Sequence, residues 1–363
     1  MDDLRLVHFN TPQAFLEATR EFDDSFMGFC VGSLLDYLAE HPDAAADTPA
    51  DAASSKPVYL YAIYENDDLL VALTRNAHDF AWMMSVPTTA AASALTAPGA
   101  PQLAPALALL ARAVHAALPS PAHFDTLIGP APAVAALVAA WAALVPGSRV
   151  HAGKTNLASR VGYATRASLP LPPPSAPPHA CVVRLAGTEE DLEALVPLHV
   201  AFRLESAWRH VVSAEEARAA LRPAVRRGTA WVGTVDGRPV GYVVLGRVTA
   251  RTIAVRNVYV APEARRRGVA GAMVRAVTRY YLGAGLEGVE GVPEGPPAVG
   301  WKREVNLNAA DPAAERVYRR AGFMFPDPED ETKGGVDPET GRKAWYASIW
   351  REVEPKEKSV DES

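Results

Sequence analysis

The segment that most constrains the fold is residues 255–281, where a β-rich stretch is followed by a turn rich in arginine and glycine and then by a helix. The turn reads RRRGVAG over residues 265–271. Glycine lets the backbone approach a ligand closely, and arginine adds charge-assisted hydrogen bonds. A strand that leads through such a turn into a helix N-terminus predicts a binding site for an anionic phosphate group.

The spacing of the glycines excludes two common phosphate-binding motifs. The segment lacks the GxxxxGK(S/T) spacing of nucleoside-triphosphate loops. It also lacks the GxGxxG spacing of dinucleotide-binding folds, and no acidic residue ends a second strand about twenty residues later. The phosphate ligand therefore belongs to another class.

Two motifs resemble those of the GNAT superfamily, the acyl-CoA-dependent N-acyltransferases. The pyrophosphate loop of that family reads Arg/Gln-x-x-Gly-x-Gly/Ala, and Arg265, Gly268 and Ala270 occupy its positions. A second family motif, Asn-x-x-Ala-x-x-x-Tyr-x-x-x-Gly-Phe, is matched over residues 311–323, with Asp311 in place of Asn. The resemblance covers residues 180–353 and is most specific in 258–271 and 311–323.

The resemblance implies a mixed sheet that opens between its fourth and fifth strands to admit the pantetheine arm, which pairs with the fourth strand as an added strand would. Carried over by position, the pantetheine would lie along Val258, Tyr259 and Val260. The remaining residues implied for acetyl-CoA are those of the loop and of the second motif: Arg265, Arg266, Arg267, Gly268, Val269, Ala270, Gly271, Asp311 and Ala314.

Tyr318 falls on the family's tyrosine, which implies that it is the general acid. Expulsion of a thiolate with a solution pKa of about 8.5 can be assisted by a phenol with a pKa of about 10. The alternative is a packing role, because Ala314, Val317 and Tyr318 form one helical stripe.

The general base is left open. Arg256, Asn257, Asn306 and Asn308 occupy the strands where some family members carry a glutamate, and none is a base at neutral pH. Glu205 is the first candidate, with His210 and Glu304 as alternatives. A water relay could also replace a dedicated base.

The order of predicted elements indicates an α/β (α+β) chain with two GNAT-like copies, each a mixed central sheet with flanking helices. In the second half, strands are predicted at 182–185, 229–235, 239–248, 252–260, 304–308 and 343–353, with helices over 188–204, 213–228, from the end of the 265–271 turn to 281, and over 311–322. In the first half, helices are predicted over 11–23, 24–40, 101–117 and 132–144, and strands over 58–64, 69–74, 81–86, 126–128 and 157–167.

The first copy is predicted to be degenerate, because no Arg/Gly loop follows residue 86 and no tyrosine lies in the helix over 132–144. The expected division is a degenerate domain over 1–167, a proline-rich linker over 168–179, an acetyltransferase domain over 180–353 and a disordered tail over 354–363. Loops rich in glycine and proline, 283–303 and 326–342, are read as surface loops or, alternatively, as a lid or acidic rim over a cationic acceptor.

Composition agrees with an enzyme of two domains. Apolar residues make up 49% of the 363, and the formal net charge of −6 argues against nonspecific binding to nucleic acid. Cys30 and Cys181 cannot form a disulfide framework. No signal peptide or membrane span is predicted, so the expected location is cytoplasmic or nucleocytoplasmic.

The sequence therefore predicts an N-acetyltransferase that moves an acetyl group from acetyl-CoA to a primary amine by direct attack, with no metal and no membrane or nucleic-acid partner. No cysteine lies near either motif, which disfavours an acyl-enzyme. The alternative is a non-catalytic acyl-CoA-binding sensor or scaffold. The acceptor, the acyl chain length, N- versus O-acylation and the oligomeric state are left open.

Overall fold

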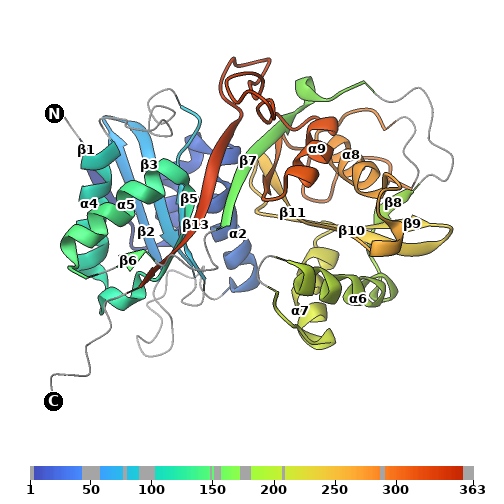
Figure 1. Cartoon of the computed structure of the whole chain (residues 1–363), viewed down its shortest axis with the longest axis horizontal. Helices are drawn as coiled ribbons and strands as arrows, with labels where there is room; N and C mark the ends of the chain where they lie inside the picture. The colour runs from blue at the N-terminus through green and yellow to red at the C-terminus, as the bar shows by residue number, and fades with distance from the viewer. Residues whose placement is uncertain are drawn as a thin grey trace. The chain divides into compact units, whose positions relative to one another are not determined.

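The computed structural model describes residues 4–42, 58–76, 80–89, 103–147, 149–150, 157–171, 181–206, 209–286 and 291–354. The chain divides into two compact units (Figure 1). Unit 1 comprises Met1–Ser159 together with Tyr346–Ser363, and unit 2 comprises Arg160–Trp345.

Unit 1 is a mixed sheet with helices on both faces (Figure 1). The strands follow the order β1-β2-β3-β4-β5-β13, and β6 pairs with β13. Its elements are β1 (Leu4–His8), α1 (Pro12–Thr19), η1 (Arg20–Phe22), η2 (Ser25–Phe29), α2 (Val31–Glu40), β2 (Tyr59–Glu65), β3 (Asp68–Arg75), β4 (Trp82–Ser85), α4 (Leu103–Ala117), η4 (Pro121–His123), β5 (Thr126–Pro130), α5 (Ala131–Leu144), β6 (Arg149–Val150) and β13 (Trp345–Glu354).

The core of unit 1 lies between the sheet and the helices α4 and α5. Both helices are rich in alanine and leucine, which have high helix propensity. Their apolar residues recur at helical spacing, so that Leu107, Leu110 and Val114 of α4 meet Leu137 and Trp141 of α5 in one cluster with the strands.

Unit 2 is a second mixed sheet, with strand order β7-β12-β11-β10-β9-β8. Helices α6 and α7 cover one face, and α8 and α9 lie on the other (Figure 1). Its elements are β7 (Leu157–Thr165), η5 (Arg166–Ser168), β8 (Val182–Leu185), α6 (Glu189–Glu205), α7 (Ala214–Arg226), β9 (Ala230–Val235), β10 (Arg238–Gly246), β11 (Thr252–Val260), η6 (Pro262–Ala264), α8 (Val269–Tyr281), β12 (Glu304–Ala309) and α9 (Pro312–Arg320).

Local sequence explains where the elements of unit 2 begin and end. Thr188 and Ser213 each form a capping box at the start of α6 and α7, which satisfies two backbone donors apiece. Asp236 and Gly237 adopt positive φ angles of 51° and 73° in the turn between β9 and β10, as a two-residue hairpin turn requires.

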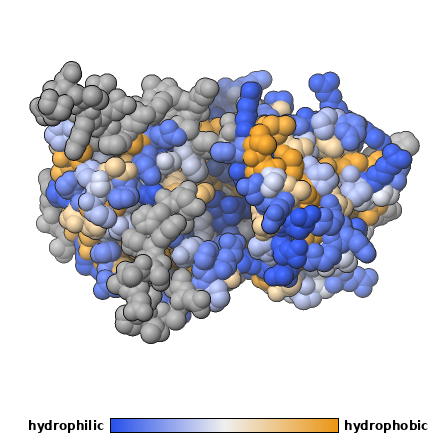
Figure 2. Space-filling view, turned by 90° about the horizontal axis from the view of Figure 1, so that it is seen from below, coloured by the Kyte–Doolittle hydropathy of each residue, from blue (hydrophilic) through white to orange (hydrophobic). Residues whose placement is uncertain are grey.

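Polar residues predominate on the right-hand part of the face drawn in Figure 2, where a hydrophobic patch interrupts them.

The two units repeat one pattern of strand pairing, which confirms the predicted tandem arrangement. In unit 1, β1 to β4 pair antiparallel in sequence order, and β4 pairs parallel with β5. In unit 2, β8 to β11 pair antiparallel in the same way, and β11 pairs parallel with β12. Each unit therefore holds a five-stranded copy of the same sheet.

The final strands of the two copies are exchanged. β7 follows the elements of unit 1 in sequence, yet it pairs antiparallel with β12 in unit 2. β13 follows those of unit 2 and pairs antiparallel with β5 in unit 1. At these two strands the compact units do not coincide with the predicted domains 1–167 and 180–353.

Two further expectations differ from the structure. The helix predicted over 24–40 is an α-helix only from Val31. Before it, Asp24 accepts hydrogen bonds from the amides of Phe26 and Met27 and starts the 3-10 helix η2 instead. Strand β1 was not predicted. Residues 43–57, 172–180 and 355–363, which include the predicted low-complexity loop and most of the predicted linker and tail, lie outside the described residues.

Candidate active site

Strands β11 and β12 separate partway along their length. Their parallel ladder runs from Thr252 opposite Glu304 to Val255 opposite Leu307. Beyond that point β11 continues to Val260 and stays paired with β10. The register against β10 shifts at the point of separation, which makes Arg256 a β-bulge in β11. A bulge raises the local twist of its strand, so it favours the divergence that opens this edge of β11 to an added extended chain.

The loop after β11 ends at a helix start whose geometry and charge favour an anion. Gly268 is the N-cap of α8 in a left-handed conformation with φ +81°, and Arg266 has φ +61°. A Cβ placed on Gly268 would meet no atom within 4 Å, so the space above it is open. The first N–H groups of α8 have no partner within the helix, the helix dipole is positive there, and the first turn carries no acidic residue.

The side chain of Arg265 turns back toward β11 and α6. Its Nε donates to the Val260 carbonyl oxygen at 2.9 Å, and its guanidinium lies 5.5 Å from the centre of the Tyr259 ring. Nη2 forms an ion pair with Glu205, whose other oxygen accepts from the Tyr259 hydroxyl at 2.7 Å. The Arg265 side chain therefore fixes the shape of the loop.

Glu205, the first candidate for the base, is thus held by two donors. The hydrogen bond from Tyr259, followed by that from Arg265, lowers the pKa of the Glu205 carboxyl below its ordinary value. Burial and the Glu205 carboxylate raise the pKa of Tyr259 to about 12. A carboxylate stabilised in its charged form takes up a proton less readily, which disfavours its use as a base.

The remaining loop residues surround the start of α8. Arg266 and Arg267 are exposed, Val269 is buried, and Ala270 is half-buried. A Cβ on Gly271 would lie 3.9 Å from Val317 of α9. Helices α8 and α9, which carry the two sequence motifs, therefore approach each other at Gly271.

Helix α9 carries the second motif. Asp311 is its N-cap and accepts from the amide of Ala313 at 2.7 Å, and Ala314 is half-buried in the first turn. Tyr318 is half-buried with its ring against Phe323, at 6.0 Å between centroids. Burial, with a smaller contribution from the Asp311 charge, raises the pKa of Tyr318 to about 12. The phenol is therefore protonated at neutral pH, and no described residue forms a hydrogen bond with its hydroxyl.

The structure also reveals a buried polar pair that sequence reasoning missed. His199 of α6 is buried, and its Nδ1 lies 3.0 Å from the hydroxyl of Tyr242. Burial, and secondarily the charge of Arg203, lowers the pKa of His199 to about 4, so the ring is neutral. The available signal was a histidine on the apolar stripe of α6, with Leu195 and Phe202.

The other two candidates for the base, His210 and Glu304, lie apart from the contacts among Glu205, Tyr259 and Arg265. His210 is exposed in the segment between α6 and α7. Glu304 is half-buried at the first position of β12, opposite Thr252. Glu304 thus lies at the end of the ladder away from the point where β11 and β12 diverge. Among the described residues no group of His, Cys, Asp and Glu could hold a metal ion.

Comparison with known families identifies this half of the molecule. The model of the acetyltransferase (GNAT) domain matches residues 226–324, from the last residue of α7 to just beyond α9. The matched segment contains the diverging strands, the loop over residues 265–271 and Tyr318. The chain carries a GNAT acetyltransferase domain. GNAT acetyltransferases transfer acetyl groups from acyl-CoA, so the match supports acyl-CoA as the co-substrate of this domain.

Solved structures of GNAT proteins are similar over nearly the whole chain. A GNAT acetyltransferase from Colwellia psychrerythraea is 10% identical and covers 96% of this chain and 99% of its own, with a TM-score of 0.43. A GCN5-related N-acetyltransferase from Sphaerobacter thermophilus is 14% identical over 97% of both chains, with a TM-score of 0.46. A tandem GNAT protein from the clavulanic acid biosynthesis pathway is 14% identical over 96% and 98%, with a TM-score of 0.38. No curated protein sequence matches the chain.

Two features of this segment bear on what it could bind. The space above the left-handed Gly268 is open, and a helix N-terminus is a favourable place for a phosphate group. The edge of β11 beyond Val255 can accept an extended arm. Within the described ranges no helix is long and apolar enough to cross a membrane.

Proposed function

We propose that the chain is an N-acetyltransferase that moves an acetyl group from acetyl-CoA to a primary amine by direct attack. One observation carries the proposal. The left-handed N-cap of α8, the divergence of β11 from β12 and the half-buried Tyr318 all lie within the segment that matches the GNAT domain. These three features together support acetyl transfer rather than phosphate binding alone.

In this proposal the chain holds acetyl-CoA by its backbone. The amides of residues 266–271 hold the pyrophosphate, and Val258, Tyr259 and Val260 provide a strand edge for the pantetheine arm. Arg265 acts through its side chain, which ties the loop to Val260 and Glu205. Asp311, which caps α9, and Ala314 in its first turn complete the acetyl-CoA site.

Tyr318 donates the proton that the leaving thiolate requires. Its raised pKa keeps the phenol protonated across the pH range in which an amine nucleophile is free. A hydroxyl without a partner among the described residues is also free to bond to sulfur. We assign Glu205 a positioning role, because its carboxylate is already committed to Tyr259 and Arg265, and we propose that water carries away the proton of the amine.

The alternative is a protein that binds acyl-CoA without turnover, as a sensor or scaffold. The committed carboxylate of Glu205 favours it, since the first candidate base is a weak one. The two proposals share the acyl-CoA site and differ in the role of Tyr318.

The first experiment is a thermal-shift titration with acetyl-CoA, run on the parent and on Gly268→Glu. A ligand of the native state raises the melting temperature according to RT ln(1 + [L]/Kd). A carboxylate at Gly268 should abolish the shift, because it fills the open space and repels the pyrophosphate. Gly237→Glu is the matched control, since Gly237 also has a positive φ and open surroundings but lies in the β9–β10 turn. Loss of the shift in both variants, or no shift in the parent at millimolar acetyl-CoA, would overturn the acyl-CoA site.

The second experiment separates transfer from binding. With a panel of primary amines, Tyr318→Phe should lower kcat by about 10²–10⁴, the usual contribution of a general acid, while leaving the Kd of acetyl-CoA unchanged. If the parent binds acetyl-CoA tightly but turns over none of the amines, the result would instead favour the non-catalytic acyl-CoA-binding protein.

A further inference from the structure

Helix α9 is attached to unit 2 in an unusual way. Glu315 is the one residue of Pro312–Arg320 that is buried, whereas Ala314, Val317 and Tyr318 are only half-buried. Burial of a carboxylate is costly unless the charge is paired and hydrogen-bonded. The groups that pair with Glu315 therefore decide where the helix can lie.

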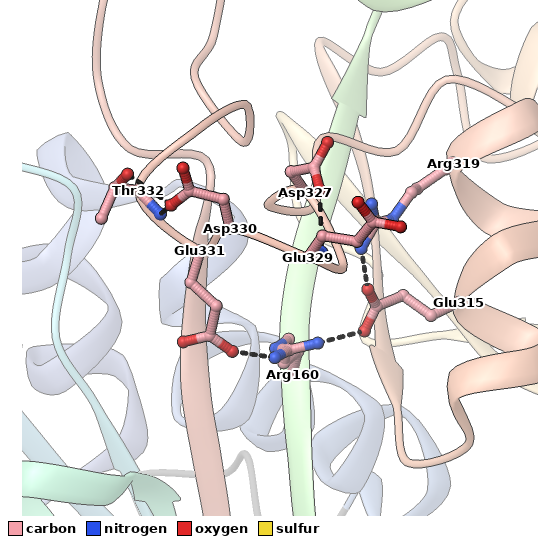
Figure 3. Close-up of polar contacts among 8 residues, drawn as sticks. All are labelled: Arg160, Glu315, Arg319, Asp327, Glu329, Asp330, Glu331 and Thr332. Carbon is pink, nitrogen blue, oxygen red and sulfur yellow. Dashed lines mark hydrogen bonds and ion pairs between the residues drawn. The ribbon is translucent and has the colours of Figure 1, made fainter.

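Two arginines meet this carboxylate (Figure 3). Arg160 Nη1 lies 3.0 Å from Oε2 of Glu315, and Arg319, one helical turn further along α9, pairs with Oε1. Both oxygens are thus occupied, and the side chain of Glu315 is only 8% exposed. Because Arg319 moves with its own helix, the pairing with Arg160 is the contact that restricts where α9 can lie.

Arg160 is itself fixed on the sheet. It lies in β7, where its backbone is paired with Ala309 of β12. Its guanidinium stands 5.5 Å from the centre of the Trp345 ring and also pairs with Glu331. In Figure 3 the guanidinium lies between the two carboxylates, with Glu331 on one side and Glu315 on the other. The ion pair therefore connects α9 to a rigid strand.

Tyr318 lies three residues after Glu315, so the two side chains are neighbours on the helix surface. Beyond the half-buried packing of its ring against Phe323, the Tyr318 side chain has no polar contact among the described residues. Rotation or sliding of α9 would move the phenol, and a displacement of about 1 Å can cost about 10²-fold in rate.

We propose that Arg160 and Glu315 are positioning residues, which hold α9 so that the hydroxyl of Tyr318 meets the leaving sulfur. The proposal rests on the proposed function, in which Tyr318 is the general acid. It gives the exchanged strand β7 a part in catalysis, although Arg160 itself does not touch the reacting atoms.

The test compares Arg160→Lys and Glu315→Gln in the parent and in a Tyr318→Phe background. Lysine keeps the charge but loses the two-pronged geometry of the guanidinium, and glutamine keeps the shape of Glu315. In the parent, each substitution should lower kcat about 10-fold or more and leave the Kd of acetyl-CoA within about 2-fold. Glu331→Gln is the matched control, because it removes the exposed partner of Arg160 only, and it should change kcat by less than about 2-fold.

In the Tyr318→Phe background, Arg160→Lys and Glu315→Gln should have almost no further effect on kcat, because residues that act through one group are not additive. An equal drop in both backgrounds, or an unchanged kcat in the parent, would overturn the positioning role. If Tyr318→Phe alone leaves kcat unchanged, the general acid is overturned and the positioning role with it. An unchanged Kd for acetyl-CoA shows that each variant is folded at the site.

Discussion

The two units share a pattern of strand pairing but differ in the helix that follows the fifth strand. In unit 1 this helix, α5, is almost wholly apolar and buries five residues, with Trp141 the largest. In unit 2 the corresponding α9 buries one carboxylate and carries three arginines. In one copy this helix is part of the core, whereas in the other it is half-exposed and held by an ion pair. The same topology therefore ends in a buried apolar helix in one half and in a charged, half-exposed helix in the other.

A second difference lies in how each unit fixes the segment after its fourth strand. In unit 1, Asp24 accepts hydrogen bonds from both the amide and the hydroxyl of Thr88 at 2.7 Å. In unit 2, Glu205 contacts the side chains of Tyr259 and Arg265. In the first copy a carboxylate therefore accepts a hydrogen bond from a backbone amide of this segment, whereas in the second copy the carboxylate contacts side chains only. Under the proposed function, the amides of residues 266–271 would then be available to the pyrophosphate.

The largest expected effect tests whether α5 belongs to the hydrophobic core of unit 1. Trp141→Ala should lower the free energy of unfolding by about 3–5 kcal/mol, because it removes a buried aromatic side chain and leaves a cavity. Denaturant unfolding measures this change in the free energy of unfolding. Leu144→Ala on the same helix is the control and should cost less than about 1 kcal/mol, since Leu144 is 36% exposed. Equal losses at the two positions would contradict the assignment of α5 to the core.

A smaller effect sharpens the role of the loop in unit 2. Gly268→Ala and Gly237→Ala each place a Cβ at a positive φ, +81° and +73°, with no atom within 4 Å. The two should therefore cost similar backbone strain, about 1–2 kcal/mol. Only Gly268→Ala should weaken the binding of acetyl-CoA. Its Kd should rise roughly 10-fold if the strained loop relaxes. Calorimetric titration measures the affinity, and the same loss in Gly237→Ala would show that the loop is not the site.

The smallest expected effect compares carboxylates of the two units by pH. Burial raises the pKa of Asp24 in unit 1. In unit 2, the Arg184 guanidinium, helped by the amides of Gly187 and Thr188, lowers the pKa of Asp191 to about 2. A lowered pKa stabilises the fold above the unfolded value of about 4, and this stability is lost as the pH falls toward 2.

Asp191→Asn should therefore cost about 1 kcal/mol at pH 7, a figure reduced because Arg184 is 42% exposed and screened by water. The difference in melting temperature between parent and variant should shrink as the pH falls from 5 to 3. A difference that does not depend on pH would place the effect of Asp191 in its capping of α6 rather than in its charge.

Much of the fold could be predicted because its signals are local. The capping boxes at Thr188 and Ser213, the turn at Asp236 and Gly237 and the cap at Asp311 each act within a few residues. The repeat of element order predicted two copies of one sheet, and the pairing confirms it. The glycine-rich turn before a helix was predicted in the same way, whereas the left-handed conformation of Gly268 is seen only in the structure.

The rest depends on contacts between distant residues. Nothing near Arg160 in sequence indicates that it meets Glu315, 155 residues later. The exchange of β7 and β13 leaves the hydrophobic pattern of both strands unchanged, so periodicity cannot detect it. The commitment of Glu205 to Tyr259 and Arg265 likewise requires α6 and β11 to be placed side by side.

The exchanged strands have a consequence for synthesis on the ribosome. Unit 2 is a continuous segment, Arg160–Trp345, and can close once that segment has emerged. The sheet of unit 1 begins first but lacks its partner for β5 until β13 has been made. The earlier half of the chain must therefore wait with an uncovered strand edge, which is a hazard for misassembly, while the later half is completed before it.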